Sequence, residues 1–496
     1  MKYLFSILVL LCLAVYSCAP DDDLNTSSDV MLSFSTDTLR FDTVFTSLGS
    51  ATRSIKLYNN EKQPVEVSKI YFEEGASTRF RMNVDGLPGA AENVKIPAND
   101  SIYIFMEVTI DPNDINSPFV VEEKLMIETN GNRQSVVLEA WGQNAIYVPN
   151  QFANGGTAVL SCNGGEVLWD DEKPYVIFGS LLIDECALRI AEGTNIYVHG
   201  GLESFQAVVE GDTVRQFYND GRIFTTETGS LRIEGTFDNP VVIQGDRLEE
   251  PFQEISGQWF GIVLSAQSTG NVFDYVTIKN AVIGVAVDSL AELTTSYSSY
   301  HNTTSAGLYA INATVNARNC LFYNNAGGGV ALLEGGEYNF DNCTMASYGV
   351  DADALSFSDA LCFGSPIPCS EFYSDDLTAR FNNCIISGSR PDEVAPFHLD
   401  VDNTTFDYEF NNCVIKLDEV LTEGGHTDFL DFCNDCIIIE NSDNLFVDEN
   451  EGDYHLDTLS VAEEKALPIS DLLFDLDNVM RDGDMPDVGC YEYVDE

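Results

Sequence analysis

Basic residues are scarce in this sequence. Its 496 residues include 24 lysines and arginines against 80 aspartates and glutamates, which gives a formal net charge of −56. Proteins that bind nucleic acid need clustered basic side chains to neutralise phosphates, so this composition excludes nucleic acid as a partner. Polyanionic ligands would also be repelled unless divalent cations bridged the contact.

Histidine and long apolar runs are scarce as well. None of the five histidines lies three or four positions from another, so the histidine spacing of zinc enzymes is absent. The one long apolar run lies at the N-terminus, and its roughly 13 residues fall short of the ~20 that a membrane-spanning helix needs. Apolar residues still make up 44% of the chain and charged residues only 21%, which predicts a folded protein with a large core.

The first 17 residues are expected to be an export signal, because Lys2 precedes the apolar run. Val15-Tyr16-Ser17-Cys18 resembles a bacterial lipobox, which implies cleavage before Cys18 and attachment of lipid to its sulfur. The aspartates at 21–23 resemble the surface-export signal of lipoproteins in the Bacteroidetes group. This resemblance implies an outer-membrane lipoprotein that faces the cell exterior, with residues 18–29 as an acidic tether.

Residues 30–145 show the alternation of a β-sandwich, with about seven short runs separated by turn residues. The clearest run places alternate residues on one face: Ile102, Ile104, Met106, Val108 and Ile110. Three segments, Leu57-Tyr58-Asn59-Asn60, Thr109-Ile110-Asp111-Pro112 and Leu138-Glu139-Ala140-Trp141-Gly142, resemble the Ig-like domain of the abnormal-spindle and Hydin type. The resemblance implies a spacer or docking module.

Residues 146–460 contain an internal repeat in which an Asn or Asp precedes a Cys and then apolar residues. The repeated cysteines are Cys320, Cys343, Cys384, Cys413 and Cys436, preceded by Asn319, Asn342, Asn383, Asn412 and Asp435. With the equivalent positions 276 and 298, the spacings are 22, 22, 23, 41, 29 and 23 residues. The longest spacing contains an insertion of about one coil, at residues 349–376.

A period near 22 residues with short β-rich runs predicts a parallel β-helix, whose coils stack ~4.8 Å apart. The cysteines are then expected to form an inward-facing file of reduced thiols, and the asparagines a ladder at the turns. Residues 188–194, 231–236 and 486–493 resemble right-handed β-helix repeat proteins of bacterial surfaces. The expected fold class is therefore all-β: an Ig-like β-sandwich, a right-handed parallel β-helix, and a C-terminal cap at 461–496.

The remaining cysteines do not form an extensive framework. Cys12 lies in the signal and Cys18 would carry lipid. Two pairs are candidate disulfides: Cys362 with Cys369 inside the insertion and, as the weaker candidate, Cys162 with Cys186. Cys433 and Cys436 form a CxxC, but Cys436 belongs to the repeat register and no second pair accompanies it, so neither redox nor zinc chemistry is predicted.

The sequence identifies no catalytic residue. Carboxylates gather near the C-terminus, at Asp475, Asp477, Asp482, Asp484 and Asp487, and form a candidate calcium site, although solvated acidic turns give the same pattern. The favoured function is a rigid surface that binds or adheres to glycan or protein partners. The alternative is a carbohydrate-active enzyme, a polysaccharide lyase or a glycoside hydrolase. Tyr297, Tyr300 and Phe322 are candidates for a sugar-stacking strip, although inward packing explains them more simply.

Overall fold

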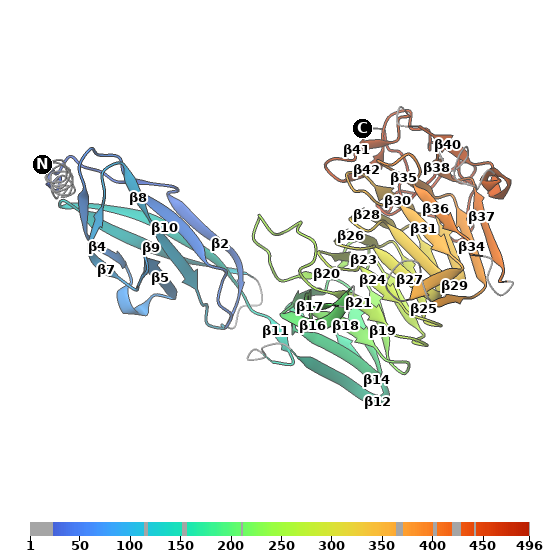
Figure 1. Ribbon diagram of the computed structural model, residues 1–496, viewed down its shortest axis with the longest axis horizontal. Coiled ribbons are helices and arrows are strands. Elements are labelled where there is room, and N and C mark those ends of the chain that lie inside the picture. The colour runs from blue at the N-terminus through green and yellow to red at the C-terminus, as the bar shows by residue number, and fades with distance from the viewer. Residues whose placement is uncertain are drawn as a thin grey trace, which may run out of the picture. The chain divides into compact units, whose positions relative to one another are not determined.

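The computed structural model describes residues 23–113, 118–150, 156–209, 212–363, 371–399, 404–418, 428–440 and 443–495 (Figure 1). The chain divides into two compact units, Met1–Asn144 and Ala145–Glu496. The predicted all-β fold class is confirmed, since the helical elements of the described residues are the short 3-10 helices η1 (Gly75–Ser77) and η2 (Phe429–Phe432). None of the helical segments in these ranges is long and apolar enough to cross a membrane.

The first unit is a sandwich of two five-stranded sheets around one apolar core. One sheet has the order β1 (Ser33–Phe34), β3 (Arg53–Asn59), β8 (Asp100–Val108), β5 (Phe80–Val84), β6 (Leu87–Pro88). The other has the order β2 (Thr38–Phe45), β10 (Asn132–Gln143), β9 (Phe119–Thr129), β4 (Val65–Phe72), β7 (Ala91–Ile96). Alternation along β8 buries Ile102, Ile104, Met106 and Val108, as predicted, and leaves Tyr103 and Phe105 on the outer face.

The second unit contains a β-helix with one continuous 11-stranded parallel sheet. Its strands follow one another along the axis: β11 (Ile146–Val148), β13 (Tyr175–Phe178), β15 (Asn195–His199), β20 (Val241–Gly245), β23 (Val276–Lys279), β26 (Ser299–Thr303), β28 (Leu321–Asn325), β30 (Thr344–Ser347), β35 (Ile385–Gly388), β38 (Val414–Lys416) and β40 (Ile437–Ile439). We refer to this sheet as the long sheet.

The other faces of the β-helix belong to a single 15-stranded sheet, because long strands run through a bend from one face to the next. In β27, for example, the first part pairs with β24 and the last part with β25, and Asn312 lies between them at φ 42°. The strands in chain order are β12 (Thr157–Trp169), β14 (Ser180–Ala191), β18 (Arg222–Thr225), β19 (Ser230–Glu234), β21 (Gly261–Leu264), β22 (Asn271–Asp274), β24 (Val285–Val287), β25 (Glu292–Ser296), β27 (Leu308–Arg318), β29 (Val330–Asp341), β31 (Leu355–Ser358), β34 (Leu377–Asn382), β36 (Val394–Phe397), β37 (Phe406–Asn411) and β39 (Cys433–Asn434).

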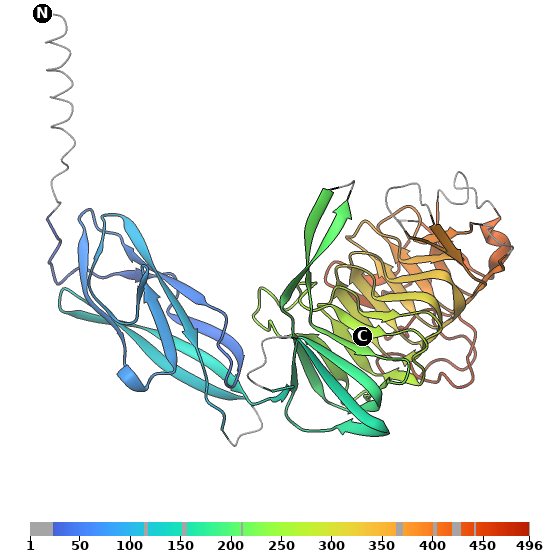
Figure 2. The ribbon, with the colours of Figure 1, turned by 60° about the horizontal axis from the view of Figure 1, so that its bottom comes forward.

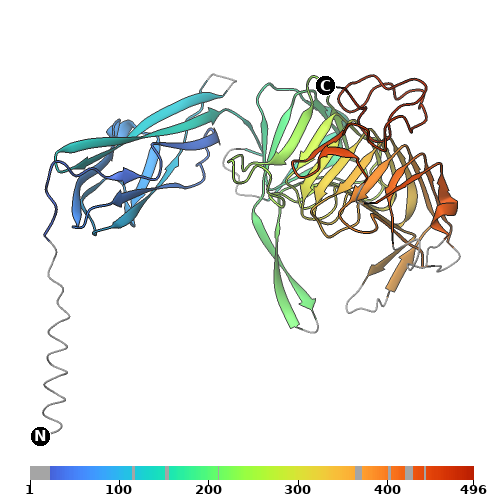
Figure 3. The same cartoon turned by 90° about the horizontal axis from the view of Figure 1, so that it is seen from above.

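Three hairpins interrupt the coils. The pair β16 (Leu202–Val209) and β17 (Asp212–Asn219) and the pair β32 (Ala360–Phe363) and β33 (Glu371–Ser374) project from the β-helix (Figures 2 and 3). The expected extra coil at 349–376 is wrong, because Thr344 pairs directly with Ile385 and the insertion contributes strand β31 of the same coil plus a hairpin. The third hairpin, β41 (Phe446–Asp448) with β42 (Asp453–Leu456), lies in the C-terminal segment.

The turn before each strand of the long sheet explains the repeated asparagine. Asn319, Asn342, Asn383 and Asn412 have φ between 48° and 53°, and Asp435 has φ 53°. Left-handed backbone costs most side chains free energy, and Asn and Asp tolerate it best because their short polar groups bond locally. The recurring Asn-Cys pair is therefore a turn residue followed by the first inward-facing residue of the next strand.

The C-terminal segment, residues 443–495, lies along the outer face of the long sheet instead of closing its end. Leu321, Ala346, Ile385, Val414 and Ile439 of the sheet share an apolar cluster with residues such as Phe446, Leu456, Ala462 and Val488. The turn asparagines also bind it: Asn319 Nδ2 donates to Phe474 O at 2.7 Å, and Asn383 Nδ2 donates to Leu467 O at 2.8 Å. The segment expected to cap the β-helix at 461–496 is thus a lateral cover over several coils.

Candidate functional site

Outward-facing residues of the long sheet form the floor of the candidate site. Lys279, His301 and Tyr323 are register neighbours on β23, β26 and β28. The residues beside them on the inner face, Ile278, Tyr300 and Phe322, are fully buried. Period-two alternation therefore separates a core row from a surface row along the same strands.

Two segments cover parts of this floor and leave a cleft between them. The loop before β21 contacts the sheet through Glu254, whose carboxylate lies 3.0 Å from Lys279 Nζ and also accepts from Asn302 Nδ2. The C-terminal segment contacts it through Tyr454, whose ring centroid lies 5.2 Å from that of Tyr323. The cleft has a volume of about 410 Å³ and is lined by Glu254, Asn302, Tyr323, Asn324, Tyr348, Gly349, Glu449, Asn450, Glu451, Gly452 and Tyr454.

The tyrosines of the cleft are protonated hydrogen-bonding groups with apolar faces. Burial raises the pKa of Tyr323 and of Tyr348 to about 12, and burial also raises the pKa of Tyr454. The Tyr348 hydroxyl is 2.7 Å from Ser387 Oγ. These rings combine an aromatic face with a hydroxyl at the rim, as amphipathic ligands require.

A buried histidine supports the floor. His301 is 7% exposed and stacks on Tyr323 with 4.5 Å between ring centroids. Burial lowers the pKa of His301 to about 4, so its imidazole is neutral near pH 7. Its buried Nδ1 has no hydrogen-bond partner among the described residues. His301 therefore packs under the cleft as a neutral ring.

A second hollow, of about 690 Å³, lies on the other face of β42 around His455. His455 Nε2 is 2.8 Å from Asp477 Oδ2 and its Nδ1 is 2.6 Å from Asp453 Oδ1. Asp477 first, and then Asp453, raise the pKa of His455 to about 9 against the effect of its burial. Both ring nitrogens are engaged by carboxylates, so this imidazolium anchors the hairpin and is not available as a base at neutral pH.

The candidate calcium aspartates do not converge on one point. Asp475 accepts from the backbone N–H groups of Asp477, Val479 and Glu492, with distances of 2.7–2.9 Å. Asp487 accepts from the N–H groups of Glu464 and Tyr493, and Asp482 from those of Asp484 and Met485. Within the described residues no group of three or more His, Cys, Asp or Glu side chains is placed to hold a metal. Calcium binding stays a prediction.

The five repeat cysteines occupy equivalent positions on successive coils, because each is followed by a register-paired residue of the long sheet. Cys320, Cys343, Cys384 and Cys413 are fully buried, and burial raises their thiol pKa values. Cys436, the last, is only partly buried. The file therefore forms a closed core row with one end near the surface.

The amide ladder is more extensive than the repeat suggested. Asn383 Nδ2 donates to Asn342 Oδ1 at 3.1 Å, while Asn319 turns toward the C-terminal segment. A second ladder runs one residue earlier in each coil, from Asn434 to Asn411 at 2.8 Å, Asn411 to Asn382 at 3.0 Å and Asn382 to Asp341 at 2.9 Å. The sequence displays this second row as the residue before each Asn-Cys pair.

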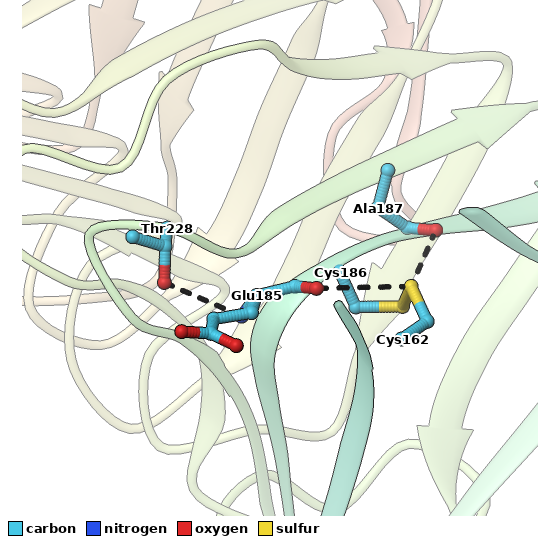
Figure 4. Close-up of a disulfide and its surroundings, with 5 residues drawn as sticks. All are labelled: Cys162, Glu185, Cys186, Ala187 and Thr228. Carbon is cyan, nitrogen blue, oxygen red and sulfur yellow. Dashed lines mark hydrogen bonds between the residues drawn. A yellow bond between two sulfur atoms is a disulfide. The ribbon is translucent and has the colours of Figure 1, made fainter. Parts of the chain in front are cut away.

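The first coils carry a disulfide between Cys162 and Cys186, on the paired strands β12 and β14 (Figure 4). Cys162 also lies 3.8 Å from Glu185 O, at the bend of β14. Cys362 is disulfide-bonded, and its predicted partner Cys369 lies outside the described residues. The predicted lipidation residue Cys18 lies outside them too, as does His426.

Sequence reasoning missed the cleft residues. It proposed Tyr297, Tyr300 and Phe322 for sugar stacking, but Tyr300 and Phe322 are fully buried and stack at 5.0 Å in the core, and Tyr297 stacks on Tyr275 at the turn. The usable signal was position: Tyr323 is three residues after the repeat cysteine, on the outward phase. Tyr348 and Tyr454 carried no signal.

Comparison with known proteins supports the fold. A family model described as "Right handed beta helix region" matches residues 175–345. No curated protein matches the sequence. Similar solved structures include the catalytic unit of a GH87 alpha-1,3-glucanase from Streptomyces thermodiastaticus strain HF3-3, at 10% identity over 73% of this chain and 74% of that one, with a TM-score of 0.27.

Two further structures match the chain over a smaller share. They are the ASH/PapD-like domain of human CEP192, at 10% identity over 26% of this chain and 95% of that one with a TM-score of 0.17, and the Vibrio cholerae VesB protease, at 9% identity over 23% of this chain with a TM-score of 0.17. The chain spans only 31% of the length of the VesB chain. TM-scores this low support no conclusion about activity.

Proposed function

We propose that this protein is a lipid-anchored cell-surface protein whose β-helix binds a glycan in the cleft between Glu254 and Tyr454. The observation that carries the proposal is the cleft itself, where three tyrosines meet two asparagine amides and carboxylates on a rigid sheet. Sugars present apolar C–H faces and dense hydroxyls. Tyrosine rings suit the faces, and amides and carboxylates suit the hydroxyls.

The size and the construction of the cleft support a small-molecule or chain-end ligand. Its volume of about 410 Å³ lies within the ~300–1,000 Å³ that is typical of ligand pockets. Its floor is register-locked sheet, and Asn324 Nδ2 donates to Asn302 Oδ1 at 2.5 Å, so the polar groups are held before a ligand arrives. Pre-organised groups lose little entropy on binding.

Charge selects among glycans. Glu254, Glu449 and Glu451 line the cleft, and of these Glu254 is paired with Lys279. With a net charge of −56 on the chain, uronate-rich or sulfated glycans are disfavoured. The expected ligand is a neutral or amino sugar.

The N-terminal part of the chain supports the location. Tyr16-Ser17-Cys18 carries the lipobox resemblance, and the acidic residues after it carry the surface-export resemblance. In this proposal the N-terminal sandwich is an Ig-like spacer of the abnormal-spindle and Hydin type, which holds the β-helix away from the membrane.

Binding is tested by titrating the protein with a panel of neutral, amino and uronate oligosaccharides and measuring heat or fluorescence. Tyr348→Ala and Asn324→Ala should each weaken binding at least tenfold, about 1.4 kcal/mol. The matched control is Tyr103→Ala, since Tyr103 is a partly exposed tyrosine on the outer face of the sandwich. Affinity unchanged in both cleft variants would contradict the assignment of the site.

The same panel tests the alternative of a carbohydrate-active enzyme. New reducing ends, or absorbance from unsaturated uronates, would replace binding by catalysis, and Glu254→Gln and Glu449→Gln would then be the first variants to assay because paired carboxylates perform glycoside hydrolysis. The anchor is tested separately by labelling with palmitate and by membrane fractionation. Cys18→Ala should abolish both signals, and retention of the label would contradict lipidation.

A further inference from the structure

The last coil departs from the core pattern of the coils before it. Phe340, Phe381 and Phe410 stack along the axis with ring centroids 5.3 and 4.7 Å apart. The residue in register with Phe410 on the next strand is Cys433. A thiol therefore replaces the inward-facing phenyl ring at the end of this row.

The file of repeat cysteines ends on the same coil, at Cys436. Cys433 and Cys436 both pack against the β-helix core, both are free thiols, and both are partly exposed. The four repeat cysteines before them are fully buried. Two inward rows thus end on thiols that solvent reaches.

The turn between them brings the two sulfurs together. Asp435 has the left-handed conformation of the other coil turns, with φ 53°, so residues 433 and 436 face the same interior. Cys436 Sγ lies 3.4 Å from Phe410 O, in the position that Cys413 takes toward Phe381 O at 3.3 Å. The Cys433 and Cys436 thiols hydrogen-bond to each other.

We propose that Cys433 and Cys436 are a redox site that forms a disulfide by exchange with a disulfide of small thiols or of a thiol oxidase. The Cys436 thiolate attacks one sulfur of that disulfide, its S–S bond breaks, and one thiolate leaves. The Cys433 thiolate then attacks the mixed disulfide at Cys436 and releases the second thiolate. Two protein thiols are oxidised and the external disulfide is reduced to two thiols.

The surroundings favour this order of attack. Hydrogen bonds from Cys413 and Cys433 lower the pKa of Cys436 to about 4, which makes its sulfur the nucleophile at neutral pH. The same contact raises the pKa of Cys433, so Cys433 acts second. Disulfides such as Cys162–Cys186 persist in oxidising compartments, where the two thiols would meet the same oxidants.

The cross-link would close the terminal turn of the β-helix. Strands β39 and β40 end their sheets within the described part of the chain, so the last coil lacks a neighbour on one side. An unpaired edge is the part of a repeat array that opens first. A covalent bond across this turn restrains that edge.

The test uses the full chain equilibrated in glutathione buffers of graded redox ratio, alkylated, digested with trypsin and weighed. Residues 417–465 contain no Lys or Arg before Lys465 and no cysteine other than the pair, so one tryptic peptide reports on both thiols. We expect this peptide to lose two hydrogen masses and to take up no alkyl group in oxidising buffer. Two alkyl groups on the peptide, or stable glutathione adducts, would overturn the proposal.

The matched control is Cys433→Phe, which restores the phenyl ring of the other coils and is therefore compatible with the core. In this variant Cys436 should take up one alkyl group in every buffer. Reductant should lower the Tm of the wild-type protein more than that of Cys433→Phe, because the other disulfides respond equally in both. An equal decrease in both proteins would show that no cross-link restrains the last coil.

Discussion

Replacing Asn383 by alanine tests whether the turn asparagines hold both the coil and the C-terminal segment. The side chain is 2% exposed and makes three hydrogen bonds: Nδ2 to Asn342 Oδ1 at 3.1 Å, Nδ2 to Leu467 O at 2.8 Å, and Oδ1 from Leu467 N at 3.0 Å. At about 1 kcal/mol net each, their loss costs about 3 kcal/mol.

Backbone conformation adds to that cost. Residue 383 has φ 53°, where alanine is less favourable by about 1–2 kcal/mol. We therefore expect Asn383→Ala to reduce the free energy of unfolding of the β-helix by about 4–5 kcal/mol. Asn383→Gly loses the same hydrogen bonds but avoids the left-handed strain, at an entropic cost of about 0.5–1 kcal/mol, so it should be less destabilised than alanine by about 0.5–1 kcal/mol.

The assay is urea unfolding followed by the fluorescence of Trp169 and Trp259, which are buried in the β-helix. Limited trypsin digestion should show faster cleavage at Lys465 and Arg481 in Asn383→Ala, because the C-terminal segment loses its attachment. Asn316→Ala, at an exposed position on the same face of the chain's coils, should change stability by no more than about 0.5 kcal/mol. A loss below about 1 kcal/mol in Asn383→Ala, or glycine worse than alanine, would refute the reasoning.

Three further outcomes follow from single residues. The pKa of His455 is raised to about 9, so its contribution to stability is complete below its unfolded pKa of ~6.5 and is lost as pH rises through 9; His455→Gln should flatten this part of the Tm–pH profile, and an unchanged profile would argue against the carboxylate pairing. Burial raises the pKa of Glu393 to about 7, so stability should fall between pH 4.5 and pH 7, and Glu393→Gln should remove that fall in chemical unfolding at the two pH values. Phe381→Ala, in the middle of a three-ring stack, should cost about 3–5 kcal/mol in urea unfolding and Phe381→Leu clearly less, whereas equal losses would point to a backbone effect.

The repeat could be predicted because its causes are local. A left-handed turn selects Asn or Asp, the next residue points inward and must be small, and alternation continues from there, so Asn342 and Cys343 display in one coil what Asn383 and Cys384 display in the next. The same logic placed the buried residues of β8 in the sandwich. It failed at 349–376, where spacing alone could not separate an added coil from a hairpin such as β32–β33.

The amino-acid sequence by itself determined the all-β class, the period of the coils and the residues of the inner rows, because each of these depends on neighbours a few positions away. Only the tertiary structure decided where the C-terminal segment lies, and with it the cleft that joins Glu254, Tyr323 and Tyr454. The same holds for Cys433 and Cys436, whose meaning depends on the phenyl rings of earlier coils. Contacts between residues hundreds of positions apart are set by how side-chain faces pack, and a linear pattern does not contain that information.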